Sequence, residues 1–142
     1  MILVDVNLLV YAHAPSLPEH ARAREWLEEK LSGSAPVGIP WESLVGFTRL
    51  LSNPRVFQKA LPVEAAWKRA AALLEPEPVW IPLPTERHAD VLGDLLGARG
   101  LGARHVPDAH LAALAIEHGL TLCSTDGDFA RFQGLRWTNP LA

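Results

Sequence analysis

Short apolar segments alternate with longer segments of helical periodicity along the whole chain, and this alternation constrains the fold more than any other feature. The first segment, Ile2–Val6, has the continuous apolar character of a strand that is buried on both faces. The expected strands are Ile2–Val6, Val37–Ile39, Val79–Ile81, Leu120–Ser124 and Leu135–Thr138. Strands that alternate with helices build a mainly parallel sheet, so we expect an α/β fold.

Helices are expected between these strands. The predicted segments are Leu8–Ala12, Pro18–Leu31, Trp41–Leu51, Pro62–Leu74, Pro84–Leu96 and Val106–Gly119, with a short helical turn inside Asp126–Phe132. Asn7 and Thr85 have side chains suited to capping the first and fifth of these helices. Pro107 suits the first turn of the sixth, and Gly119 suits its end.

Composition places limits on the class of protein. With 142 residues, 49% of them hydrophobic and 20% charged, the chain is expected to form one domain over residues 1–142. No apolar run approaches the ~20 residues of a membrane-spanning helix, and the N-terminus lacks signal-peptide features. Cys123 is the only cysteine, which excludes a disulfide framework and a thiolate zinc site, and a cytoplasmic location is expected.

The formal net charge of −3 argues against a protein that coats nucleic acid without specificity. This net charge does not exclude a nuclease, because the carboxylates of a metal site add negative charge locally and the bound cations neutralise it.

Four carboxylates from separate regions are expected to converge. Asp5 ends the first strand and Asp126 follows the fourth, which places both at the carboxyl edge of a parallel sheet. Glu42 and Asp108 lie in the first turns of helices that begin near that edge, and Asp128 follows two residues after Asp126. Neighbouring carboxylates need a counter-charge, and Mg²⁺ or Mn²⁺ prefers oxygen ligands. The alternative is a set of unrelated acids that each favour a helix N-terminus.

Taken together, these residues resemble those of the PIN-domain family, and more narrowly the VapC-type toxins of bacterial toxin–antitoxin systems. The resemblance covers essentially the whole chain and is carried by ILVDVNLLVYAHAP, IPWESLVGFTRLLSNP and VPDAHLAALAIEHGLTLCSTDGDFARFQGLRWTNP. These segments contain Asp5, Glu42, Asp108 and Asp126, and Ser124 stands where the family more often has Thr. The resemblance implies a three-layer α/β/α fold with a mainly parallel central sheet.

The resemblance also implies a function. It indicates a Mg²⁺- or Mn²⁺-dependent endoribonuclease that cleaves structured RNA, either tRNA or rRNA, through attack of an activated water on a phosphodiester. It implies a cognate antitoxin that binds the toxin and blocks its site, and a homodimer. The catalytic and metal-binding acids that it implies are Asp5, Glu42, Asp108 and Asp126, with Glu42 as a ligand or as the water-activating base.

Residues beside these acids are assigned supporting roles. Asn7 and Ser124 are candidates for orienting carboxylates or water, with simple capping as the alternative. Asp128 is a third supporting candidate, although an acid at such a position is more often a turn residue than a ligand. The candidates for contacts to RNA phosphates are Arg99, Arg104 and His105, with a solvated loop as the alternative. His110 lies about 200° around the helix from Asp108, so it is expected to be a packing or surface residue.

Two other functions remain open on the sequence alone. One is a catalytically weak PIN-like module that binds RNA. The other is a phosphate-ester hydrolase of another family, such as a haloacid-dehalogenase-type phosphatase. That enzyme class requires a second Asp two residues after the nucleophilic Asp, and the corresponding position here holds Asn7.

Overall fold

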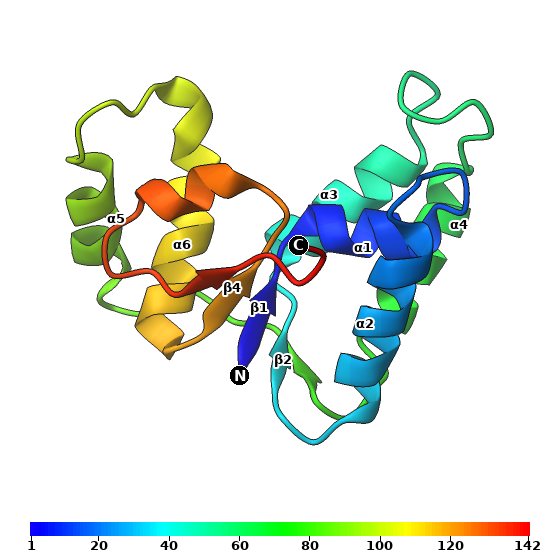
Figure 1. Cartoon of the computed structure of the whole chain (residues 1–142), viewed down its shortest axis with the longest axis horizontal. Coiled ribbons are helices and arrows are strands. Elements are labelled where there is room, and N and C mark those ends of the chain that lie inside the picture. The colour runs from blue at the N-terminus through cyan, green and yellow to red at the C-terminus, as the bar shows by residue number, and fades with distance from the viewer.

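A five-stranded parallel sheet forms the centre of the computed structural model, which describes residues 1–142 (Figure 1). The strands are β1 (Ile2–Val4), β2 (Val37–Gly38), β3 (Val79–Trp80), β4 (Thr121–Cys123) and β5 (Trp137–Thr138). Their order across the sheet is β3-β2-β1-β4-β5, and every neighbouring pair is parallel. All five carboxyl ends therefore lie along one edge, as the strand predictions required.

The helices follow the predicted segments with shifts of a few residues at their ends. They are α1 (Val6–His13), α2 (His20–Ser32), α3 (Trp41–Leu51), α4 (Val63–Ala72), α5 (His88–Leu96) and α6 (Val106–His118). Two 3₁₀ turns, η1 (Ala103–His105) and η2 (Gly127–Arg131), precede α6 and β5. None of the helices is both long enough and apolar enough to cross a membrane.

Successive side chains of β1 and β4 pack into different hydrophobic cores. Leu3 and Leu122 pack with residues of α5, α6 and η2, whereas Val4 and Cys123 pack with residues of α1 to α4. The two groups of helices lie on opposite sides of the strands in Figure 1. The α/β class and the three-layer arrangement are thus confirmed, and both faces of the sheet are buried, as parallel sheets require.

Two of the predicted helix caps are wrong. The α1 cap is Asp5, whose Oδ1 accepts a hydrogen bond from the Val6 amide at 2.8 Å, because the helix begins directly after the strand. Asn7 therefore lies inside α1, and its side chain is free for a tertiary contact. Thr85 does not cap α5, which begins at His88 without a side-chain cap. The Thr85 hydroxyl accepts from the Arg87 amide and donates to Glu117 instead.

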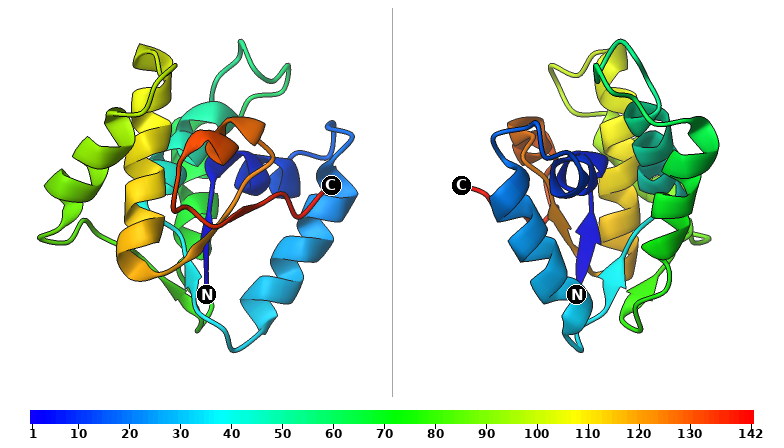
Figure 2. Two further views of the ribbon diagram at one scale, coloured as in Figure 1. Left: turned by 60° about the vertical axis from the view of Figure 1, so that its left-hand side comes forward. Right: turned by 90° about the vertical axis from the view of Figure 1, so that its right-hand side faces the viewer.

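The end of α6 follows the prediction. Gly119 has φ +67°, in the left-handed region that favours glycine, and its amide caps the last turn of the helix. The chain then enters β4 directly, so that α6 packs against the sheet with its N-terminus at the carboxyl edge of the strands (Figure 2).

Candidate metal centre

Asp5 is held rigidly where β1 ends and α1 begins. Its Oδ1 accepts from the Val6 amide, and its Oδ2 accepts from the Ser124 hydroxyl at 2.7 Å. The carboxylate is partly buried, and this burial, together with the charge of Asp126, raises the pKa of Asp5 against the lowering effect of its hydrogen bonds. These two hydrogen bonds fix the carboxylate and leave it further lone pairs that could bind a cation.

Ser124 connects the ends of β1 and β4. It is fully buried, and its hydroxyl donates to Asp5 while it accepts from the Asn7 side-chain amide at 3.1 Å and from the Asp126 backbone amide at 3.0 Å. The Asn7 carbonyl oxygen in turn accepts from the Thr125 amide at 3.5 Å. Asn7 and Ser124, two of the three predicted supporting residues, therefore contact the acids or the loop that carries them.

Three further carboxylates meet beside Asp5. Asp108 lies in the first turn of α6, Asp126 caps η2, and Asp128 lies in the first turn of η2. The Asp126 Oδ1 atom accepts from the Asp128 backbone amide at 2.9 Å, which sets the course of this loop. One carboxylate oxygen from each of these three residues lies within 4.8 Å of the others.

The electrostatics of Asp108 show how closely the acids are coupled. Its pKa is raised from an ordinary 3.8 to about 6, first by burial and then by the negative charges of Asp126, Asp5 and Asp128, in that order. Nearby His105 acts in the opposite direction. The ionised form of Asp108 is therefore disfavoured in the metal-free protein, and a positive charge that joins the cluster would stabilise it.

The donor set suits a hard divalent cation. Asp5, Asp108, Asp126 and Asp128 offer only carboxylate oxygens, which Mg²⁺ and Mn²⁺ prefer. Zinc sites are commonly built from histidine nitrogens and thiolates, and the single cysteine lies buried in the core on β4. The chemistry of the four acids therefore fits the predicted Mg²⁺ or Mn²⁺.

Glu42, the remaining predicted acid, is not among the three grouped carboxylates. It is in the first turn of α3, and its Oε1 lies 3.1 Å from the Nε2 atom of His110. The neighbouring Ser43 donates its hydroxyl to the Val4 carbonyl oxygen at 2.8 Å. One turn later, Gly46 packs so closely on α1 that an added Cβ would lie 3.2 Å from Val6. These contacts fix the start of α3 at the same edge as Asp5.

The prediction for His110 missed its main contacts. Its Nδ1 lies 2.9 Å from His88 Nε2, and its Nε2 faces Glu42. His88 continues the connection to Glu117, a carboxylate on α6 whose side chain has no exposed surface. Glu117 and His88 were not identified from the sequence. The only signal was that His110 and Glu117 are seven residues apart and hence share a helix face.

The three predicted RNA-contact residues differ in exposure. Arg99 and Arg104 are exposed, and the Arg104 guanidinium lies 3.8 Å from Asp128. His105 is only 3% exposed, because the turn η1 folds its ring inward and Nδ1 accepts from the Gly102 amide at 2.9 Å. Its Nε2 has no hydrogen-bond partner and lies 3.8 Å from Asp128 Oδ2. This buried position differs from the predicted contact between His105 and RNA.

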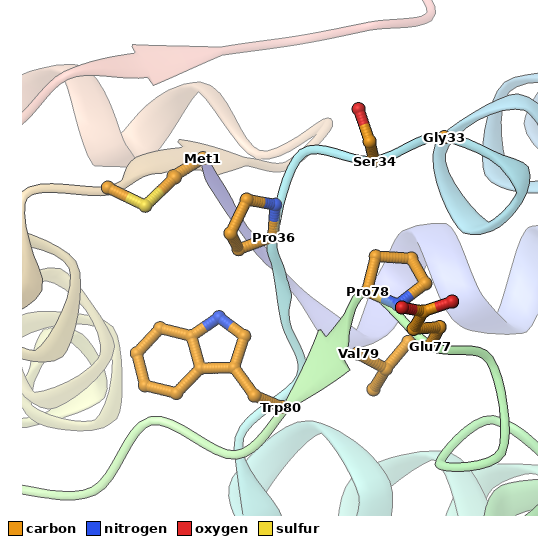
Figure 3. A pocket seen from close by; sticks show the side chains of 8 residues that line it. All are labelled: Met1, Gly33, Ser34, Pro36, Glu77, Pro78, Val79 and Trp80. Carbon is orange, nitrogen blue, oxygen red and sulfur yellow. The ribbon is translucent and has the colours of Figure 1, made fainter.

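A separate cavity of about 520 Å³ lies at the opposite edge of the sheet, beside the amino ends of β1, β2 and β3 (Figure 3). Its lining residues are Met1, Gly33, Ser34, Pro36, Glu77, Pro78, Val79 and Trp80. Glu77 is the only ionisable side chain among them, so this cavity offers none of the carboxylate grouping found at the carboxyl edge.

Comparisons with known proteins agree with this fold. The sequence matches the profile of the PIN domain family over residues 2–135. It is similar to Ribonuclease VapC37 of Mycobacterium tuberculosis, with 43% identity over 142 residues that cover 100% of this chain and 99% of that protein. The fold is similar to M. tuberculosis VapC20, described as a sarcin–ricin loop cleaving toxin, at a TM-score of 0.69, 21% identity and coverage of 96% and 99%. It is also similar to a chain of VapBC2 from Rickettsia felis bound to a promoter DNA fragment, at a TM-score of 0.67, 20% identity and coverage of 98% for both chains.

Proposed function

The chain belongs to the PIN-domain family, and from this premise we propose that it is a Mg²⁺- or Mn²⁺-dependent endoribonuclease, the toxin of a toxin–antitoxin pair. The observation that carries the proposal is the grouping of Asp108, Asp126 and Asp128 within 4.8 Å, beside Asp5, at the carboxyl edge of the sheet. Four coupled carboxylates are unfavourable without a cation, and a phosphodiester cleavage site uses one.

Most of the clustered acids are assigned as metal ligands. Asp5, Asp108 and Asp126 are the proposed ligands, and the nearby Asp128 is a further candidate. A divalent cation bound there would neutralise the carboxylates, polarise the phosphodiester and lower the pKa of water. The hydrogen bonds of Ser124 and Val6 to Asp5 hold that ligand in place before the cation arrives.

Glu42 is the proposed general base. His110 engages its Oε1, which leaves Oε2 to take a proton from the attacking water. The water oxygen bonds to phosphorus as the bond from phosphorus to the leaving ribose oxygen breaks, and that oxygen takes up a proton from solvent. The alternative role for Glu42 is that of a ligand to the cation.

The proposed substrate is a structured RNA, either tRNA or rRNA. The description of VapC20 as a sarcin–ricin loop cleaving toxin supports an rRNA stem-loop as one candidate. The exposed Arg99 and Arg104 lie on the loop just before Asp108 and supply positive charge for the phosphates. The proposed partners are a cognate antitoxin, as the VapBC assembly of a similar fold suggests, and a second copy of this chain. The proposed location is the cytoplasm, where such substrates are found.

Cleavage of RNA by the purified full-length chain tests the proposal. The wild type is incubated with Mn²⁺ and either a total tRNA pool or an rRNA stem-loop, and new 5′ ends are mapped. Asp5→Asn and Asp108→Asn are expected to abolish cleavage while the proteins remain folded. Asp90→Asn is the matched control, because Asp90 is an exposed first-turn acid of α5 that lies outside the cluster.

The outcomes separate the proposed function from its alternatives. Cleavage by the wild type and by Asp90→Asn, but by neither of the other variants, supports the nuclease. RNA binding without cleavage by an intact, Mn²⁺-loaded wild type would instead support the RNA-binding module. Hydrolysis of small phosphate esters without RNA cleavage would support the other hydrolase class, although Asn7 is committed to Ser124 and offers no second acid.

A further inference from the structure

A chain of hydrogen-bonded side chains begins at the buried end of α6. The Glu117 side chain has no exposed surface, and its Oε1 accepts from the Thr85 amide at 2.9 Å and from the Thr85 hydroxyl at 2.6 Å. Its Oε2 accepts from His88 Nδ1. A buried carboxylate is costly unless its lone pairs are satisfied, and here only donors surround it. Glu117 is therefore a fixed acceptor, and α5 and α6 are built around it.

Glu117 determines the orientation of His88. Because the carboxylate accepts from Nδ1, that nitrogen carries a proton and the imidazole plane is set. The Nε2 atom of His88 then lies 2.9 Å from Nδ1 of His110, and the two rings are nearly perpendicular at 81°. His88 comes from α5, whereas His110 and Glu117 lie two turns apart on α6. Two helices thus hold one imidazole in a single orientation.

His110 in turn contacts Glu42. Its Nε2 is 3.1 Å from Glu42 Oε1, and the Glu42 side chain is otherwise 46% exposed at the start of α3. The three hydrogen bonds from Glu117 to Glu42 contain three N–H protons, so the two imidazoles together carry one positive charge in this arrangement. A free glutamate samples several rotamers, and fixing one costs side-chain entropy. A general base works only when it lies within hydrogen-bond reach of the water that it activates. The contact with His110 restricts the Glu42 side chain before substrate binds, so less side-chain entropy is lost during catalysis.

We propose that His110, oriented by His88 and Glu117, is a positioning residue that holds the Glu42 carboxylate for catalysis. The inference rests on the proposed nuclease function, because it assigns a role within the same site. The contact with Glu42 is not needed to attach α3, since the Ser43 hydroxyl bond to Val4 and the buried Leu44 and Phe47 already do so. Removal of His110 should therefore change catalysis far more than folding.

Two substitutions at position 110 test the proposal in the full-length chain. His110→Leu removes the donor to Glu42, whereas His110→Gln places an amide N–H close to the position of Nε2. With Mn²⁺ and the RNA that the wild type cuts, His110→Leu should lower kcat about 10- to 100-fold with little change in KM. His110→Gln should recover most of that loss. His118→Leu is the control, since His118 is on the same helix but contacts the Leu83 carbonyl oxygen.

A double mutant separates positioning from general structure. If His110 acts through Glu42, Glu42→Gln combined with His110→Leu should cleave no more slowly than Glu42→Gln alone. The melting temperature and the Mn²⁺ affinity of His110→Leu should match those of the wild type. Additive losses, an unchanged kcat in His110→Leu, or equal losses for Leu and Gln would each overturn the proposal.

A spectroscopic measurement makes the test independent of cleavage. In ¹H–¹⁵N spectra of the imidazoles, Glu42→Gln should shift the ring nitrogens of His110 and leave those of His118 unchanged. No shift at His110 would mean that the link is absent, and the positioning proposal would fail whatever the activity. If the wild type cuts neither RNA but the shift occurs, the proposed function fails while the Glu42–His110 link stands, and a catalytic role for that link is then excluded.

Discussion

At the scale of single residues, the carboxylates of the acidic cluster repel one another in the metal-free protein. The raised pKa of Asp108, about 6, arises from burial first and then from its acidic neighbours. An acid whose folded pKa lies above its unfolded value binds protons more tightly when folded. Its contribution to stability is therefore largest at low pH and falls as the pH rises from about 4 to 6.

Asp108→Asn is expected to stabilise the metal-free protein. At pH 7.5 the substitution removes a charge that the fold disfavours, and after discounting for solvent screening we expect a gain of about 1–2 kcal/mol in unfolding free energy. At pH 4 the variant and the wild type should differ little. Thermal unfolding in EDTA at several pH values measures the difference, with Asp90→Asn as control. If the variant were less stable than the wild type at pH 7.5, repulsion at Asp108 would not be destabilising the metal-free protein.

Ser124 offers a prediction about a neutral residue. Ser124→Ala leaves Asp5 Oδ2 and the Asn7 amide without their shared partner, so Mn²⁺ affinity should fall about 10- to 100-fold. Ser124→Thr keeps the hydroxyl and should bind within a few-fold of the wild type. Calorimetric titration with Mn²⁺ measures both, and thermal unfolding reports any loss from the buried site. Equal affinity in Ser124→Ala and the wild type would show that Asp5 needs no such support.

Some of these residues could be predicted from the sequence, and the reason is physical. Asp5 directly follows β1, and Asp126 lies three residues after the end of β4. Because parallel strands share a carboxyl edge, the convergence of these two acids follows from their positions in the chain. The inward turn of His105 and the contact of His110 with Glu42 depend on how α6 packs against its neighbours. Glu42 and His110 are 68 residues apart, and no periodicity in either helix reports that distance.

At the scale of elements, α6 performs two tasks at its opposite ends. Its first turn carries Asp108, and its last carries Glu117, which binds Thr85 in the segment before α5 and His88 at the start of α5. The sequence predicted the bounds of α6 because Pro107 and Gly119 mark them. It did not predict where α5 begins, because the Thr85 side chain is drawn to Glu117 instead of capping the helix.

Glu117→Gln should loosen the packing of α5 on α6. The carboxylate accepts from three donors, and burial alone would raise the pKa of Glu117 but these hydrogen bonds lower it overall. An amide turns one acceptor into a donor and leaves a buried group unsatisfied, so we expect a loss of about 1–3 kcal/mol. Denaturant unfolding measures it, and Glu75→Gln, beyond α4, is the control. An unchanged midpoint would show that the three contacts contribute little.

At the scale of the whole molecule, the proposed cation would join parts that are distant in sequence. Asp5 belongs to the junction of β1 and α1, Asp108 to α6, and Asp126 to the loop after β4. The α/β architecture was predictable as a whole because the alternation of strands and helices permits few alternatives. The geometry of the acids was not, because it depends on loops whose course is set by single contacts such as that of Ser124 with Asp126.

Mn²⁺ is therefore expected to stabilise the entire fold and not one loop. A ligand that binds only the folded state adds about 2.7 kcal/mol when present at 100 times its Kd, and it should also relieve the repulsion at Asp108. Two-state thermal unfolding at pH 7.5 should shift upward in a single transition as Mn²⁺ is added. Asp5→Asn should lose most of this shift, whereas Asp90→Asn should keep it. The cation would neutralise the Asp108 charge that Asp108→Asn removes. Without metal, the Asp108→Asn variant should therefore unfold at a higher temperature than the wild type, and its melting temperature should rise less when Mn²⁺ is added. An equal shift in all three variants would place the bound Mn²⁺ outside the acidic cluster.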